Sequence, residues 1–407
     1  MAVAAPDTPS SPTPILDRII SIPAVAKPPV WQRVGSALFG LTLAGFVILI
    51  ASGVVPQNWV KIHVPFQPYL PPEPGRGILL VCALPVAIVF AISVHEIAHA
   101  LLGVALGLKL RSLRVGPIEI KWPFRLSYVR DRTARVTGWA MLFPVETRQL
   151  DGRLALIVLA GPLANLAVGL MVVLLLRPMG VFSVTFAFTS LMTAIMELMP
   201  VRRGLQVTDG LHVVRLLSSP AHRERTLVLA RLHLEQEKGV APDALSRDLL
   251  ERALATSDDS PENMGVFALA SSAAYSRNDD AMTARCLEQC LKHLAYAPPR
   301  FQHALMCDAG VFQARKRKRI DLAKQWLEQI PAKAEIPWLR AEVEIAILEV
   351  TGEFQAALCK LEALEPVVRA FPDRSYSQNQ NRSLLRWKSE LQAQIARDLQ
   401  GNEKARA

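Results

Sequence analysis

Charged residues are scarce in this chain. Only 20% of its 407 residues are Asp, Glu, Lys or Arg while 51% are hydrophobic, a balance that excludes an ordinary soluble protein. Cysteine is scarce as well: the five cysteines form no C-x-x-C pair, which favours reduced, packed thiols over disulfides or a thiolate metal site. The sequence also lacks a P-loop. Its length allows two or three domains.

The residues without charge are gathered in four long stretches. They lie at residues 34–60, 77–108, 154–176 and 178–196, and only the second is interrupted, by one H-E-x-x-H motif. A helix needs about 20 apolar residues to cross a bilayer. We therefore expect an all-α, multi-pass membrane domain over residues 33–217. Its four predicted transmembrane helices lie at residues 34–57, 78–108, 154–177 and 178–200.

The H-E-x-x-H motif sets His95 and His99 one helical turn apart, with Glu96 beside the first. Side chains at i and i+4 project from one face of a helix, so the two imidazoles can share a metal ion, and Zn²⁺ suits them. Glu96 is then placed to take a proton from an activated water. The motif also arises by chance on solvated helices, but here its surroundings are apolar, where ionisable groups are costly. Counted back from Lys109, His99 lies about 15 Å and His95 about 21 Å inside the membrane.

Three later polar residues extend the candidate site. Asn165 lies in the third apolar stretch, where its amide supports a metal ligand or substrate carbonyl, or else bonds to a neighbouring helix. Two histidines leave zinc without a third protein ligand, and Asp209 of an Asp-Gly pair is our choice. An isolated Asp-Gly pair would be an ordinary turn. Glu197, near the end of the fourth stretch, is the alternative third ligand.

Positive charge is gathered between the second and third stretches. The net charge is +10, and residues 109–153 hold ten Lys and Arg against four acidic residues. Such loops stay on the cytosolic side of a membrane, which places both termini in the cytosol, and no nucleic-acid partner is expected. Residues 113–120 and 135–143 alternate apolar and polar positions, so we expect a small β-hairpin at the membrane interface. Its edge either holds an extended substrate or only packs.

Taken in order, the motifs resemble the site-2 protease family of intramembrane zinc metalloproteases. H-E-I-A-H, G-P-L-A-N and P-x(8)-D-G together cover roughly residues 77–215. The resemblance implies a core of three helices, zinc held by His95, His99 and Asp209, and Glu96 as general base. It also implies membrane-spanning protein segments as substrates and a multi-pass location in the plasma (inner) membrane.

The chain departs from that family before Asp209. Similar proteins usually carry N-x-x-P followed closely by D-G, whereas here Glu197 stands at the asparagine position and the linker is longer and basic. Asn165 and Glu197 are therefore the candidates for supporting the substrate or its oxyanion. Two alternatives to an active protease stay open: a weak or inactive homologue that serves as a membrane-anchored scaffold, and another membrane-anchored zincin with a glutamate ligand.

The rest of the chain has the pattern of a soluble helical domain, which we expect over residues 218–400. Turn signals at residues 276–279, 316–319 and 351–353 are followed by small residues whose spacings of 39 and 34 are close to the 34-residue period of helix-turn-helix repeats. These small residues are Ala284, Ala323 and Ala357. The segment thus resembles a tetratricopeptide-like array that offers a groove to a cytosolic protein partner, with an unrelated helical bundle as the alternative.

Three further segments complete the prediction. Residues 1–32 contain seven prolines and are expected to form a disordered cytosolic tail, as are residues 401–407 at the other end. Residues 315–319 are five consecutive basic residues, for which we expect a solvated turn between helices, with contact to anionic lipid as the alternative.

Overall fold

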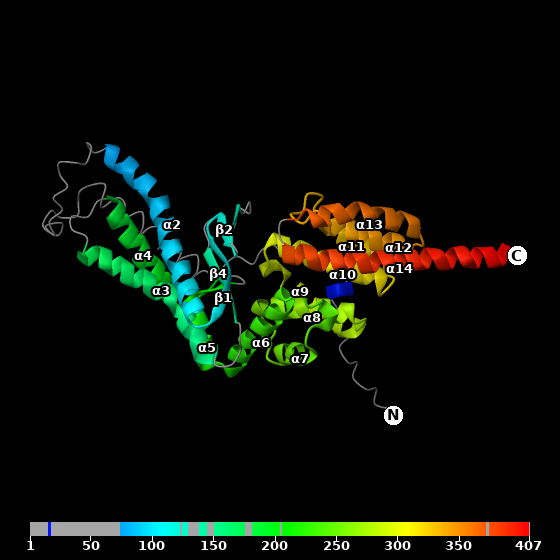
Figure 1. The fold of residues 1–407 in the computed structure, drawn as a ribbon, viewed down its shortest axis with the longest axis horizontal. Coiled ribbons are helices and arrows are strands. Elements are labelled where there is room, and N and C mark those ends of the chain that lie inside the picture. Colours follow the sequence, from blue (N-terminus) through cyan, green and yellow to red (C-terminus); the bar gives the residue numbers. More distant parts are fainter. Residues whose placement is uncertain are drawn as a thin grey trace, which may run out of the picture. The chain divides into compact units, whose positions relative to one another are not determined.

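The structure is a computed structural model, and the chain in it divides into two compact units. One unit is Lys27–Leu234, and the other combines Met1–Ala26 with Glu235–Ala407 (Figure 1). The described residues are 15–17, 74–122, 124–128, 138–144, 150–175, 181–203, 206–371 and 374–406. The first predicted transmembrane helix, at residues 34–57, lies outside them.

The unit Lys27–Leu234 contains a bundle of three helices, α2, α3 and α4, which pack against one another in every pairing (Figure 1). A small sheet contacts α2 through β1 and β4, and α5 contacts both α3 and α4. The elements are α2 (Pro74–Ala105), β1 (Leu108–Val115), β2 (Ile118–Lys121), β3 (Arg125–Tyr128), β4 (Gly138–Pro144), α3 (Leu150–Leu175), α4 (Val181–Leu198), β5 (Arg202–Arg203), β6 (Gln206–Val207), α5 (Asp209–Ser218) and α6 (Pro220–Glu237).

Within the described residues, two helices are long and apolar enough to cross a membrane, Cys82–Ala105 and Gly152–Leu175. The prediction of a fourth such helix, at residues 178–200, is therefore wrong. The fourth predicted span is the shorter apolar segment Phe182–Leu198 of α4, which ends just before Pro200, a residue that cannot continue a helical hydrogen-bond ladder. Both long helices expose large apolar side chains. On α3 these include Leu156, Leu163, Leu170, Leu174 and Leu175.

The predicted hairpin is in fact a four-stranded antiparallel sheet with the strand order β3-β2-β1-β4. One predicted strand, residues 113–120, is broken into β1 and β2 because Gly116, with φ +57°, turns the chain between them. The start of β1 also shortens the predicted helix 78–108, since Gly107 at φ +91° turns the chain out of α2.

The earlier end of α2 changes the expected depth of the motif. Measured from Ala105, the end of the helix, His99 lies about 9 Å and His95 about 15 Å along it. Both residues are thus closer to the helix end than the count from Lys109 predicts.

Helix α6 belongs largely to the unit Lys27–Leu234. Leu227 packs against a cluster formed by Leu108 and Ile157, which ties α6 to β1 and α3. The border between the compact units consequently falls at residues 234/235, while the sequence suggests a border at 217/218.

The second unit is built mainly from helices that follow one another as helix-turn-helix pairs. The pairs α8/α9, α10/α11 and α12/α13 each make extensive internal contacts. Their turns contain Asn278, Lys318 and Gly352, all with positive φ, where turn signals were predicted. The elements are η1 (Ile15–Asp17), α7 (Arg247–Ala255), α8 (Met264–Ser276), α9 (Asp280–Lys292), α10 (Pro299–Arg315), α11 (Ile320–Gln329), α12 (Leu339–Val350), α13 (Phe354–Arg369) and α14 (Arg374–Arg406), with short 3-10 turns η3 (Pro242–Ala244), η4 (Pro261–Asn263) and η5 (Leu294–Tyr296) between them.

Two predicted disordered tails are ordered in part. Helix α14 runs to Arg406, which includes all but the last residue of the tail predicted at 401–407. Residues 15–17 of the predicted N-terminal tail form η1, which contacts α9. Glu403, Lys404, Ala405 and Arg406 have good helix propensity, which favours the continued helix despite Gly401 and Asn402.

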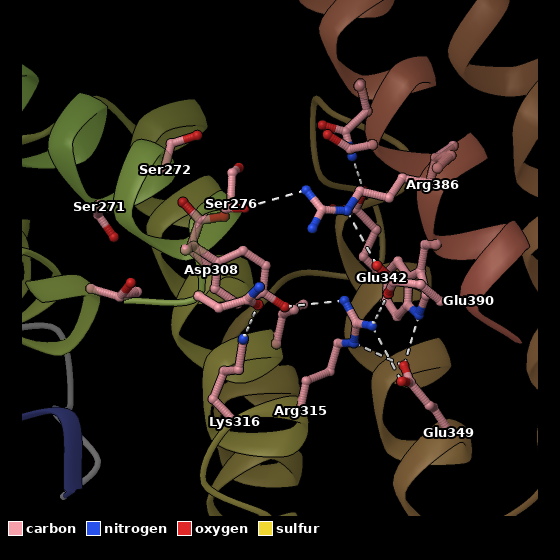
Figure 2. A pocket seen from close by; sticks show the side chains of 18 of the residues that line it. Ser271, Ser272, Ser276, Asp308, Arg315, Lys316, Glu342, Glu349, Arg386 and Glu390 are labelled. Atoms are coloured by element: carbon pink, nitrogen blue, oxygen red, sulfur yellow. Dashed lines mark hydrogen bonds and ion pairs between the residues drawn. The ribbon is translucent and has the colours of Figure 1, made fainter. Parts of the chain in front are cut away.

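The basic run 315–319 is not a solvated turn along its whole length. Arg315 donates to both carboxylate oxygens of Glu349 at 2.8 and 3.2 Å and forms an ion pair with Glu390 at 2.7 Å (Figure 2). Lys316 pairs with Asp280 at 3.3 Å. Arg315 and Lys316 thus meet acidic partners inside the unit, whereas residues 317–319 are exposed, as a solvated turn requires.

A cavity of about 330 Å³ opens beside this ion network, lined by residues from α8, α10, α12 and α14 (Figure 2). Burial raises the pKa of Asp308 to about 7, and burial together with the nearby Asp308 raises the pKa of Glu342 to about 8. All five cysteines are free; Cys286 and Cys290 are buried thiols on α9.

Candidate metal centre

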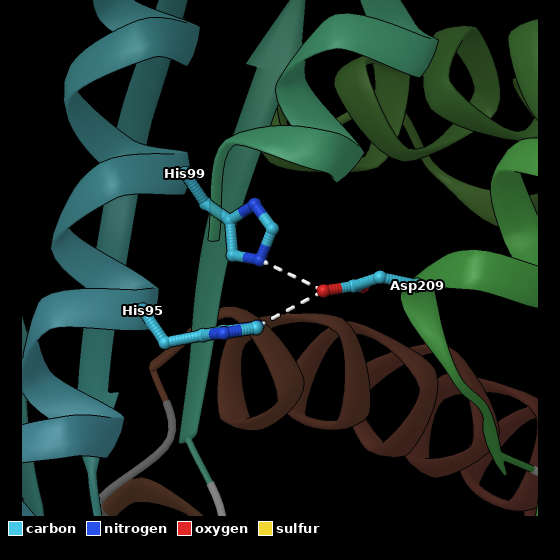
Figure 3. A group of neighbouring side chains, drawn as sticks. All are labelled: His95, His99 and Asp209. Atoms are coloured by element: carbon cyan, nitrogen blue, oxygen red, sulfur yellow. Dashed lines mark hydrogen bonds and ion pairs between the residues drawn. The ribbon is translucent and has the colours of Figure 1, made fainter. Parts of the chain in front are cut away.

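The three predicted metal ligands converge in the structure. Asp209 Oδ2 lies 2.9 Å from His95 Nε2 and 3.3 Å from His99 Nε2 (Figure 3). One ligand atom from each of the three residues lies within 4.8 Å of the others. Among the described residues this is the group of histidine, cysteine and carboxylate side chains that has the spacing to hold a metal ion.

Helix α2 presents both imidazoles to the same point, and neighbouring helices hold their far nitrogens. His99 Nδ1–H donates to the Ile157 carbonyl at 2.6 Å, which leaves Nε2 facing Asp209. The Asn165 amide donates to His95 Nδ1 at 3.4 Å, and Ser190 Oγ–H donates to Asn165 Oδ1 at 3.3 Å. Such outer contacts fix ring orientation in metal sites. Asn165 thus contacts a candidate ligand, and it is fully buried.

Asp209 reaches the histidines because a short hairpin turns the chain back after α4. Strands β5 and β6 pair with each other, and Thr208 then caps α5 by accepting a hydrogen bond from the Leu211 amide at 3.4 Å. Thr208 Oγ1 also donates to the Met199 carbonyl at 2.5 Å. These contacts tie the first turn of α5, and with it Asp209, to the end of α4.

The electrostatics of the group favour an ionised aspartate. Burial opposes the charge of Asp209, but its contacts with the imidazoles of His95 and His99 outweigh that cost and lower the pKa of its carboxyl to about 2. A carboxylate next to two imidazole nitrogens is a donor set that suits a transition metal, Zn²⁺ included.

Three glycines make the close packing around the site possible. A Cβ on Gly161 would lie 2.7 Å from His95 Nε2 and closer still to His99 Nε2. A Cβ on Gly138 would lie 2.5 Å from Glu96 Cγ, and one on Gly210 would overlap the Leu198 carbonyl. Real Cβ atoms do not approach other atoms this closely, so each position requires the absence of a side chain.

The sequence pattern predicts no site role for Gly138, Gly210, Ser190 or Thr208. A signal existed for Gly138, since an isolated glycine within a predicted strand marks a close approach of another group. Ser190 shows no comparable signal, because hydroxyls in apolar helices often bond to their own backbone.

A cavity of about 490 Å³ opens beside the three ligands. Glu96, only 8% exposed, and Glu197 both line it, together with Gly138, Trp139 and Ala140 of β4. Glu197 lines the cavity but is not a member of the group with metal-ligand spacing. The arrangement combines a possible metal ion, a buried carboxyl and room for a peptide next to a strand.

No protein-family model, curated protein or solved structure matches this chain.

Proposed function

We propose that the chain is an intramembrane zinc metalloendopeptidase of the site-2 protease type, which hydrolyses peptide bonds in or near membrane-spanning segments. The observation that carries this proposal is the convergence of His95, His99 and Asp209 beside Glu96. His95, Glu96 and His99 lie on Cys82–Ala105, a helix of membrane-spanning length and composition, and Asp209 begins α5.

Zinc is the metal proposed because the donors are two imidazole nitrogens and one carboxylate oxygen, which is a usual set for catalytic zinc. His99 already has the tautomer that ligation needs, since Nδ1–H donates to a carbonyl. His95 needs its proton on Nδ1 as well. If the side-chain amide of Asn165 is flipped, its Oδ1 accepts a hydrogen bond from His95 Nδ1–H and its Nδ2 donates one to Ser190 Oγ.

Glu96 is the proposed general base. A zinc ion, when bound, supplies a Lewis acid that polarises the scissile carbonyl and lowers the pKa of water. Glu96 accepts a proton from the attacking water and returns it to the departing amide nitrogen. Its enclosed position beside Gly138 keeps the carboxyl close to the ligands and away from bulk solvent.

The substrate is proposed to pair with β4. This strand stands at the end of the sheet order, and its residues Gly138, Trp139 and Ala140 line the cavity. A segment added to that edge would be held in extended form by backbone hydrogen bonds, as a protease requires. The exposed aromatic residues Trp122, Phe124 and Tyr128 suit the interface between bilayer and water.

The test combines metal analysis with cleavage of a membrane-anchored reporter by the purified full chain. We expect one zinc ion per chain in the wild type. Glu96→Gln should keep zinc but lose cleavage by about 100-fold or more. Asp209→Ala should lose both, whereas Glu197→Gln, which changes another carboxylate of the same cavity, should keep its zinc.

The two alternatives predict other outcomes. A zincin with a glutamate ligand would keep zinc in Asp209→Ala and lose it in Glu197→Gln. A scaffold would show no cleavage that Glu96→Gln abolishes, whatever its zinc content. Either result would overturn the proposed function.

A further inference from the structure

The segment η1 (Ile15–Asp17) lies far from the helices in sequence but is enclosed by them. Leu16 is only 1% exposed, and η1 contacts α9. In Figure 1 it is the dark blue turn beside the helices of the second unit. Three residues of a proline-rich segment therefore fill a site on the surface of the helical unit.

Helix α9 holds the backbone of this segment. Glu288 Oε1 accepts a hydrogen bond from the Ile15 amide at 2.7 Å, and Oε2 accepts one from the Leu16 amide at 2.8 Å. Hydrogen bonds to a charged carboxylate are stronger than those between neutral groups. Two consecutive amides on one carboxylate fix the register of a peptide whatever its side chains are.

Helix α10 and the turn after it hold the carbonyl and acidic side of the same segment. Gln313 Nε2 donates to the Leu16 carbonyl at 2.7 Å and to Asp17 Oδ1 at 3.3 Å, and Arg317 forms an ion pair with the Asp17 carboxylate. With the segment in place Gln313 is fully buried, and its Oε1 has no hydrogen-bond partner among the described residues. A buried amide is costly unless it is bonded, so the contacts of its nitrogen favour an occupied site.

The site therefore recognises three features of a short peptide. Glu288 binds two successive backbone amides, and an enclosed position accepts leucine. Gln313 and Arg317 bind a backbone carbonyl and the carboxylate that follows it. This combination of apolar pocket and bonds to the peptide backbone is how proteins recognise short linear segments.

We propose that this surface of α9 and α10 is a peptide-binding site for apolar-Leu-Asp segments, that Ile15–Asp17 occupies it in cis, and that a partner protein carrying such a segment displaces it. The contacts of Ile15–Asp17 themselves are far smaller than a stable interface between proteins, which buries about 20 residues a side. Occupancy by η1 is favoured by its covalent tether, which makes this contact intramolecular. A partner with a longer segment of the same chemistry can compete. The proposal is independent of the proposed protease chemistry.

The experiment measures binding of a fluorescein-labelled peptide, residues 11–21 of this chain, to the full-length protein in detergent by fluorescence anisotropy. We expect wild-type protein to bind it weakly because η1 occupies the site. Leu16→Asp in the protein should empty the site and tighten binding at least tenfold. Adding Glu288→Gln should weaken it again by at least tenfold, whereas adding Glu251→Gln, on an exposed glutamate of α7, should leave it unchanged.

A charge exchange tests the site without relying on Glu288. A peptide with Asp17→Arg should bind poorly to the Leu16→Asp protein and regain at least tenfold when the protein also carries Arg317→Asp. The proposal is overturned if Leu16→Asp does not tighten binding. It is also overturned if a folded Glu288→Gln protein, judged by circular dichroism, binds as well as the control, or if the charge exchange gives no recovery.

Discussion

Gly161→Ala is expected to remove zinc from the site without unfolding the protein. The added Cβ would lie 2.7 Å from His95 Nε2 and closer still to His99 Nε2, whereas ordinary van der Waals contact begins at 3.4 Å. The imidazoles or α3 must therefore move by at least about 0.7 Å. A metal site tolerates ligand displacements of only about 0.2 Å. Overpacking of this kind costs about 1–3 kcal/mol, which corresponds to a loss of zinc affinity of about 5- to 150-fold.

The assay titrates the purified variant with zinc against a chelator of known affinity and measures reporter cleavage at the same free zinc. Gly152→Ala is the matched control, because Gly152 lies on the same helix and a Cβ there meets nothing within 4 Å. It should leave zinc affinity and cleavage unchanged. Equal zinc affinity in the two variants would show that the imidazoles do not need the space that a side chain at position 161 would occupy.

Two further predictions concern other buried groups. Gly138→Ala should leave zinc content unchanged but lower cleavage, since its Cβ would meet Glu96 Cγ at 2.5 Å; loss of zinc instead would contradict this placement. Burial raises the pKa of Asp308 and Glu342 to about 7 and about 8 from usual values near 4, so each carboxyl binds its proton more tightly in the folded state. The free energy of unfolding that these carboxyls contribute is greatest below about pH 4. It is lost as the pH rises through the two folded-state pKa values, by at most about 4 to 5 kcal/mol per group. Urea unfolding of the helical unit should therefore become easier from pH 5 to pH 9, and Asp308→Asn with Glu342→Gln should flatten this slope.

The site residues that the sequence predicts are those whose proximity is set by neighbouring positions in the chain. His95 and His99 share a helix face by periodicity alone, so their proximity needs no tertiary information. Asp209 is over a hundred residues away and was selected by chemistry and by a family resemblance. The sequence signals a close approach at Gly138, but it does not show which side chain faces Gly138 or Gly161, because that depends on how other helices and strands pack.

The fold also divides into features that the local sequence predicts and features that depend on tertiary packing. Apolar length predicted α2 and α3 but overstated α4, because composition does not show where Pro200 and the following hairpin end the helix. Turn signals located the turns at Asn278, Lys318 and Gly352. They could not show that η1 fills a site on α9, since a contact across more than 250 residues depends on the assembled surface.

The longer linker before Asp209 does not by itself argue for an inactive protein. The added residues are taken up by the β5–β6 hairpin, in which Arg202 pairs with Val207, and Thr208 donates to the Met199 carbonyl just after α4. Gly210 then packs so closely on the end of α4 that no side chain fits. A linker that only tolerated extra length would leave α5 loosely placed, whereas this one is fastened at three points. The Asp209 carboxylate consequently lies beside His95 and His99, and the longer linker changes only the route of the chain that carries it there.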